Sequence, residues 1–314
     1  ARNRIVEFNA QNIANTAWAF AKAGVAAPRL FQAIADEAPR RIDEFYPQAM
    51  ANTAWAFAKA GAASPQLFDA IAAAARLHIG EFKPQEMANT VWAFAISRSA
   101  PRLFEAIASE TSRRVGDFNS KDLASTAWAL ACVAWPDRQI FEDLGLAIAG
   151  RLDEMTEPEQ SQLYLVALQM RTQWPDLNTP LAAHVETFRR AYARFEPQPS
   201  QLQRDVSAAL AALGWSHDFE HRTQDGFSLD MADPASKWAV EVDGPTHFLR
   251  DVSSGEFVVT GATTFKARLL REAGWTLSSL SYFDFLGRTD AEQAELLADL
   301  LRRRPTTPHE AGAL

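Results

Sequence analysis

The sequence of 314 residues contains one cysteine, Cys132, which excludes an internal disulfide framework and any zinc site built on several cysteines. It also lacks an apolar run near the roughly 18 residues that a membrane-crossing helix needs, so we expect no membrane partner. No secretory signal pattern opens the chain. The chain does not begin with Met, and we expect that its N-terminus is incomplete.

A surplus of positive charge is absent as well, because 31 Lys and Arg residues stand against 39 Asp and Glu residues. The two parts of the chain differ: residues 1–151 hold 16 basic and 15 acidic residues, whereas residues 152–314 hold 15 basic and 24 acidic residues. Binding to a phosphate backbone would therefore depend on local basic patches rather than on an overall positive field.

The first part of the chain is an internal repeat. Its tryptophans recur at spacings of 37, 37 and 36 residues, in blocks close to Ala-Asn-Thr-Ala-Trp-Ala-Phe-Ala: Trp18, Trp55, Trp92 and Trp128. Two helices are predicted in each repeat. Gly61 stops the first helix of the second repeat, and Pro65 and Pro101 open the second helices of the second and third repeats. Two short helices cannot bury an apolar stripe alone, so the repeats are expected to stack into an α-solenoid.

One stripe of the first helix in each repeat carries small or polar residues that are candidates for RNA contact: Asn12, Asn15, Lys22, Asn52, Lys59, Glu86, Asn89, Asp122 and Ser125. A variable position beside a nearly constant Asn or Ser suits a surface that reads one base per repeat. The alternative is a solvated face, or a face that contacts the neighbouring repeat. The tryptophans could stack on bases, but tryptophan at a repeat period is more typical of the core between repeats.

These repeats resemble the heptatricopeptide and octotricopeptide-like helical repeats of organellar RNA-binding proteins. The resemblance covers about residues 5–170 and rests on the Ala-Asn-Thr-Ala-Trp-Ala-Phe-Ala motif. It implies a role in binding single-stranded RNA, from ribosomal RNA or another organellar transcript.

The second part predicts a small α/β domain after a helix over residues 181–194. Ser200 is the expected N-cap of a helix that ends at Gly214. Strands are expected near 217–220, 226–231, 238–243 and 276–281, with helices near 264–273 and 290–302, and a hairpin joins the second and third strands. We therefore predict a helical-repeat domain over 1–195, an α/β domain over 196–304 and a disordered tail over 305–314.

Three carboxylates are expected on one face of the predicted hairpin. In the strand 238–243, Glu241 and Asp243 alternate with apolar residues, and Asp230 occupies the matching face of the preceding strand. Three converging carboxylates would suffice to hold Mg²⁺ or Mn²⁺, and a metal-held water could attack a phosphodiester. An Asp at the end of a strand is, however, also a common turn former.

Further polar residues could complete such a site. His247 could act as a general acid or base, and Lys266 and Arg268 on the next helix could neutralise a phosphate. The ordinary alternatives are a histidine that satisfies a hydrogen bond and basic side chains that face solvent.

This part resembles the RAP domain, an RNA-associated module with a restriction-endonuclease-like core, over about residues 200–300. The matching segments are Ser200-x-x-Gln203-x-x-Val206, Asp225-Gly-Phe-Ser-Leu-Asp230, Glu241-Val-Asp-Gly-Pro-Thr-His-Phe248, Thr260-Gly-x-Thr-x-x-Lys266-x-Arg268-x-Leu270 and Gly274-Trp275. The resemblance implies the fold of PD-(D/E)XK nucleases. One departure matters: Asp243 stands where that nuclease pattern has lysine, so His247 or Lys266 would have to substitute for it.

The resulting hypothesis is an α-solenoid of two-helix repeats that selects RNA, followed by a RAP domain that contacts or cleaves it. Cleavage would make the protein a metal-dependent endoribonuclease with Mg or Mn as its cofactor. The alternative is a non-catalytic scaffold for RNA and protein, such as a ribosome assembly factor or ribosomal subunit with ribosomal protein partners. By resemblance alone, the location is a mitochondrion or chloroplast.

Overall fold

The structure, a computed structural model, describes residues 4–177, 179–194 and 198–304. It divides into two units, one of Ala1–Ala191 with Phe248–Phe265 and the other of Tyr192–His247 with Lys266–Leu314. The predicted boundary at 195–196 and the predicted disordered tail at 305–314 fall outside the described residues.

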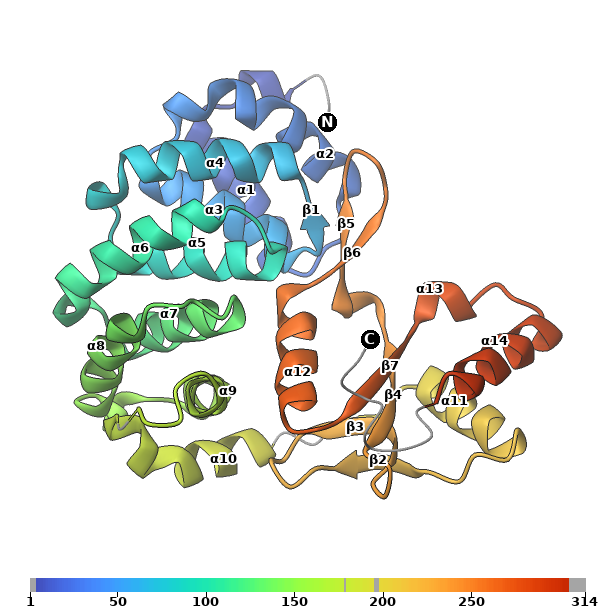
Figure 1. The fold of residues 1–314 in the computed structure, drawn as a ribbon. Helices are drawn as coiled ribbons and strands as arrows, with labels where there is room; N and C mark the ends of the chain where they lie inside the picture. The colour runs from blue at the N-terminus through green and yellow to red at the C-terminus, as the bar shows by residue number, and fades with distance from the viewer. Residues whose placement is uncertain (1–3, 178, 195–197, 305–314) are drawn as a thin grey trace. The chain divides into compact units, whose positions relative to one another are not determined.

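The first unit is an array of helix pairs, as the repeat predicted (Figure 1). The first helices of successive pairs are α1 (Ala10–Lys22), α3 (Pro47–Lys59), α5 (Pro84–Ser97), α7 (Ser120–Cys132) and α9 (Glu157–Gln173). The second helices are α2 (Pro28–Glu37), α4 (Pro65–Leu77), α6 (Pro101–Arg114) and α8 (Arg138–Ala149). Short 3-10 helices lie at η1 (Ile5–Glu7), η2 (Ala38–Glu44), η3 (Ile79–Glu81), η4 (Val115–Asp117) and η5 (Leu152–Glu154). The array continues into η6 (Pro180–His184) and α10 (Val185–Ala193), where one closing helix was predicted.

The helix starts follow from the local sequence. Proline occupies the first turn of α3, α4, α5 and α6, where its missing N–H needs no partner. The Ser64 side chain accepts a hydrogen bond from the Leu67 N–H at the start of α4. Successive first helices pack directly on one another, and aromatic pairs from neighbouring repeats fill the core. Phe31 meets Phe57 edge-on, for example, with ring centroids 5.0 Å apart.

A β-hairpin from the second half of the sequence belongs to this repeat array. It consists of β5 (Phe248–Asp251) and β6 (Phe257–Val259), and β5 pairs in parallel with β1 (Ala62–Ala63) between α3 and α4. The Arg250 N–H donates to the Gly61 carbonyl at 2.8 Å, and the Val252 N–H donates to the Ala63 carbonyl at 2.9 Å. These strands were not predicted. The expected assignment of all of 196–304 to one α/β domain is therefore corrected, because Phe248–Phe265 packs with the repeats.

The segment Phe248–Phe265 is called the inserted segment below. The helix α12 (Gly261–Glu272) begins near its end. The Thr260 hydroxyl caps it by accepting a hydrogen bond from the Thr263 N–H at 3.2 Å. A Cβ added to Gly261 would overlap the carbonyl oxygen of Ala95 in α5, so only glycine fits at this close approach. Four residues later, the buried Phe265 ring meets Trp128 of α7 edge-on, with ring centroids 6.0 Å apart.

The second unit is built on a mixed sheet in the order β2-β3-β4-β7. Its strands are β2 (Asp218–Arg222), β3 (Ser228–Asp233), β4 (Trp238–Asp243) and β7 (Thr276–Ser281), and its helices are α11 (Gln201–Ala212), α13 (Tyr282–Phe285), α14 (Asp290–Arg302) and the later residues of α12. The predicted hairpin is confirmed, because β3 and β4 are antiparallel with Met231 opposite Val240. The predicted bounds of β4, β7 and α14 also agree with the structure.

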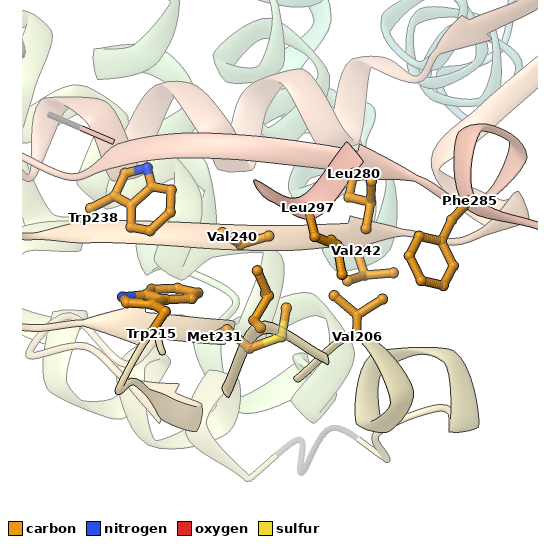
Figure 2. Packing of buried hydrophobic residues seen from close by; sticks show 10 residues of the cluster. Val206, Trp215, Met231, Trp238, Val240, Val242, Leu280, Phe285 and Leu297 are labelled. Carbon is orange, nitrogen blue, oxygen red and sulfur yellow. The ribbon is translucent and has the colours of Figure 1, made fainter. Parts of the chain in front are cut away.

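One face of this sheet carries the core of the second unit. Figure 2 shows Trp238, Val240 and Val242 projecting from β4 into a cluster with side chains from the neighbouring strands and helices. Val206 and Leu210 come from α11, Leu297 comes from α14, and the Trp215 and Trp238 rings lie with centroids 4.5 Å apart. The opposite face of β4 is thus left to Glu241 and Asp243, as the alternation predicted.

Candidate functional site

The predicted carboxylates lie on the polar side of the sheet in the second unit, and each has its own hydrogen-bonding partners. Asp230 is buried in β3, where its Oδ2 accepts a hydrogen bond from the Val242 N–H at 2.7 Å. Its Oδ1 accepts from the Gln203 amide at 2.8 Å. This carboxylate therefore completes the β3–β4 ladder with a side chain, and burial raises its pKa.

Gln203 has a structural role that the sequence motif did not reveal. It lies in the first turn of α11, where its Oε1 accepts a hydrogen bond from the Ser200 N–H and the Ser200 hydroxyl accepts one from the Gln203 N–H. This is a capping box. The same amide reaches Asp230, so the motif residues Ser200, Gln203 and Asp230 form one chain of hydrogen bonds from a helix start to a strand.

Glu241 forms an ion pair with Lys266. The Lys266 Nζ lies 2.5 Å from Glu241 Oε2, whereas Glu241 Oε1 is buried without a hydrogen-bond partner among the described residues. Burial, together with the neighbouring carboxylates Asp230 and Asp243, raises the pKa of Glu241 to about 7 against the opposing effect of Lys266. The charges of Glu241 and Asp230 raise the pKa of Lys266 above its ordinary value, despite the opposing effect of burial, so the lysine stays protonated at neutral pH.

Asp243 has different partners. The Ser279 hydroxyl of β7 donates to Asp243 Oδ2, and Asp243 Oδ1 lies 2.9 Å from His247 Nδ1. His247 is half-exposed in the short helix η7 (Pro245–His247). Because a neutral imidazole carries no charge, this pair is an ion pair only when His247 is protonated. Arg268 is half-buried on α12, two residues beyond Lys266.

These partners bear on the predicted metal. Across residues 4–177, 179–194 and 198–304, no three side chains of His, Cys, Asp or Glu are grouped so that they could hold an ion. The positive charge that faces Glu241 is Lys266, and both oxygens of Asp230 already accept hydrogen bonds. One atom, the unpaired Glu241 Oε1, fits the role of a ligand, but the three carboxylates in this arrangement do not form a ready coordination shell. The metal site stays a prediction.

The predicted RNA-contacting stripe divides by exposure along the first helices. The exposed members are Asn12, Asn15, Lys22 and Lys59, and the half-buried members are Asn52, Glu86, Asn89 and Ser125. The small residues between them, Ala56, Ala93 and Ala129, are fully buried because neighbouring first helices pack there. The close approach that these alanines permit is therefore between repeats.

Two members of the stripe differ from what was expected. Asp122 is 5% exposed, and burial raises its pKa, so it does not lie on the open surface that we expected. Glu86 is partly committed to helix capping, because its carboxylate accepts a hydrogen bond from the Lys83 N–H at 2.8 Å.

The tryptophans are more exposed than a core role predicts. Trp128 is 6% exposed and fits that role, but Trp18 is 36% exposed, and Trp55 and Trp92 are half-buried. The Trp18 and Trp55 rings lie with centroids 6.4 Å apart, and the Lys22 Nζ lies 4.5 Å from the Trp18 centroid. Three of the rings lie three residues beyond the Asn of their stripe, which places amide and ring on adjacent turns of one helix face: Trp18, Trp55 and Trp92.

The fold defines the chain as a helical-repeat array followed by a small α/β domain, and comparison with known proteins specifies both parts. A family model described as the RAP domain matches residues 240–300, so the predicted RAP domain is confirmed. A family model described as RNA-editing substrate-binding complex 6 protein matches residues 1–168 of the 314. The chain belongs to the family of the RNA-editing substrate-binding complex 6 protein.

A curated relative joins the same features. A RAP domain-containing protein, chloroplastic, from Oryza sativa subsp. japonica is 31% identical over 172 residues, which are 53% of this chain and 26% of that protein. The chain thus spans about a quarter of the length of this relative. No helix among the described residues is both long and apolar enough to cross a membrane.

Proposed function

We propose that this protein binds single-stranded RNA through the exposed faces of α1, α3 and α5, as part of RNA processing in an organelle. The observation that carries the proposal is the row of partly exposed tryptophans beside side-chain amides: Trp18 with Asn15, Trp55 with Asn52 and Trp92 with Asn89. Aromatic rings stack on bases of any sequence, and side-chain amides can both donate to and accept from base edges.

Charge on the same helices supports this assignment. Lys22 and Lys59 are exposed in the last turns of α1 and α3, and Lys22 lies against the Trp18 ring. A strand whose bases stack on the rings would bring its phosphates to these lysines. The RNA-editing description of the family and the RAP domain favour RNA as the partner, and the chloroplastic relative favours an organelle, either chloroplast or mitochondrion.

The experiment compares binding of a short fluorescein-labelled single-stranded RNA to wild type and to Trp18→Ala/Trp55→Ala. Loss of two stacking platforms should weaken binding at least ~10-fold, since stacking contributes about 1–3 kcal/mol per base. Tyr46→Ala is the matched control, because Tyr46 is an exposed aromatic residue outside the row. Equal affinities in the double variant and the control would refute the assignment.

A second candidate is metal-dependent hydrolysis of RNA by the RAP domain, in which Asp230 and Asp243 would have to leave their present hydrogen-bond partners to hold Mg²⁺ or Mn²⁺ together with Glu241. The unpaired Glu241 Oε1, buried beside Lys266, favours this candidate, because a buried carboxylate oxygen without a partner is suited to a ligand. The metal would supply an activated water, while Lys266 and His247 would be placed to neutralise charge and to transfer a proton.

Cleavage and binding must be scored separately to distinguish this candidate from a scaffold for RNA and ribosomal proteins. We expect Mg²⁺- or Mn²⁺-dependent cleavage of single-stranded RNA that is lost in Asp230→Ala and Glu241→Ala variants whose circular dichroism is native. Binding without cleavage under every metal condition would leave the scaffold role, in which the ion pair of Glu241 and Lys266 is purely structural.

A further inference from the structure

A groove on the repeat array has the composition of a nucleotide site. It has a volume of about 970 Å³, within the upper part of the range for ligand pockets. Its walls are the last turn of α1 with the loop to α2, the last turn of α3, and β5 of the inserted hairpin. All of these segments belong to the first unit, so the groove does not depend on the second unit.

The charged lining of the groove is entirely basic. Arg29 comes from the first turn of α2, Lys59 from the last turn of α3 and Arg250 from β5, while no Asp or Glu among the described residues lines the groove. Within the described part of the chain, no ion pair joins any of these three side chains to a carboxylate, and the Arg250 guanidinium carbon lies 6.0 Å from the Phe257 ring centroid. Three uncompensated cations around one groove create a local field that attracts an anion, although the chain as a whole is acidic.

The remaining lining is aromatic and aliphatic. Phe20 on α1 is 37% exposed at the groove, whereas its counterpart in the next repeat, Phe57, is fully buried. Val25, which is exposed, and Val252 also line the groove. An apolar wall with an accessible ring suits the flat face of a base, and the cations suit a phosphate.

We propose that this groove binds a nucleotide, with its base against Phe20 and its phosphate held by Arg29, Lys59 and Arg250. The proposal rests on the proposed RNA-binding function and deepens it, because Lys59 belongs both to the groove and to the exposed stripe. A strand lying along the tryptophans would therefore place an adjoining nucleotide in the groove. The inserted hairpin, which lies within the RAP match at 240–300, supplies Arg250, one of the three cations, and thereby completes the groove on the repeats.

The test uses the full chain and the double variant Arg29→Gln/Arg250→Gln. Its control is Arg76→Gln/Arg102→Gln, which removes two exposed arginines of α4 and α6 outside the groove. Binding of a short fluorescein-labelled single-stranded RNA is titrated at several salt concentrations. The groove variant should bind about 10-fold more weakly than the control variant, and its slope of log K against log salt should be shallower by ~1.4, since two phosphate contacts are lost.

A second arm titrates uridine monophosphate, to separate a free nucleotide from a nucleotide of a strand. RNA binding that falls in the groove variant but not in the control supports the groove as part of the RNA path. Uridine monophosphate binding that requires Arg29 and Arg250, without RNA binding by wild type, supports the groove and refutes the proposed function.

The opposite outcomes are equally distinct. RNA binding that is equal in the groove variant and the control overturns the groove and leaves the proposed function intact. Failure of wild type to bind either probe overturns both. Circular dichroism and urea denaturation of each variant establish that any loss of binding is not a loss of fold.

Discussion

Replacing Gly261 with alanine is the sharpest test of how the inserted segment is attached to the repeats. The new methyl group would overlap the carbonyl oxygen of Ala95 and approach the Cys132 sulfur at 3.3 Å. Backbone of α5 cannot move aside as a flexible side chain could, so the inserted segment must shift or detach. Overpacking of this kind typically costs about 1–3 kcal/mol.

Three contacts of the segment give the scale of the effect. Burial of Phe265 contributes about 2 kcal/mol. The two hydrogen bonds from Arg250 and Val252 to β1 and its preceding residue contribute about 1 kcal/mol each. Loss of these contacts would therefore lower the free energy of unfolding by about 4 kcal/mol. Alanine is a better helix former than glycine, which offsets somewhat less than 1 kcal/mol of that loss. We expect a net loss of about 1–3 kcal/mol in the free energy of unfolding.

Urea denaturation and amide hydrogen exchange measure the two aspects of this prediction. The control is Gly80→Ala, because a Cβ at Gly80 would meet nothing within 4 Å. Exchange of the Arg250 and Val252 amides should accelerate in Gly261→Ala and stay unchanged in the control. If both variants have wild-type stability and protected amides at these two positions, the close packing of Gly261 on α5 is refuted.

Three further changes probe single interactions. The pKa of Glu241 is raised from 4.5 to about 7, so the stabilisation that the raised pKa gives is complete below about pH 4.5 and is lost as the pH rises to about 7. Over that range the free energy of unfolding of wild type should fall by up to ~3 kcal/mol relative to that of Glu241→Gln. Urea titrations in the presence of EDTA measure this difference. A difference that does not vary with pH would contradict this assignment. Gln203→Ala should cost about 1–3 kcal/mol, because it leaves the buried Asp230 with one partner fewer, and thermal unfolding with Gln201→Ala as control measures it. Glu86→Ala should cost about 1 kcal/mol through the lost cap on Lys83 without changing RNA sequence preference, and an altered preference in a binding selection would restore Glu86 as a reader of bases.

The sequence predicted the elements whose signals are local. Prolines and caps fixed the starts of the repeat helices, and the alternation of β4 placed Trp238 in the core and Glu241 on the other face. The pairing of β1 with β5 could not be predicted, because Ala62–Ala63 is a two-residue strand without any pattern of its own. It forms because a segment far along the chain brings a complementary edge to it.

The candidate site in the second unit likewise combines features that the local sequence predicts with features that depend on distant parts of the chain. Alternation placed Asp230 and Glu241 on one face, but it could not say which group each carboxylate meets. The ion pair of Glu241 with Lys266 and the hydrogen bond of Asp230 with Gln203 depend on how α12 and α11 pack on the sheet. Trp18 and Trp128 occupy equivalent positions in their repeats, yet only the first is open, because Trp128 is covered by Phe265 of the inserted segment.

The insertion of Phe248–Phe265 also affects how this domain can be separated or inherited. The chain passes from one unit to the other at 191–192, at 247–248 and at 265–266, so no single cut releases a whole RAP domain. A fragment starting at residue 198 would leave β5 without its partner β1 and Phe265 without Trp128. Transfer of this RAP sequence to another repeat array would succeed only where that array offers two features. One is an open strand edge like that of β1, and the other is a helix that Gly261 can approach as closely as it approaches Ala95 of α5. The RAP sequence and the repeat array are therefore not expected to be interchangeable modules.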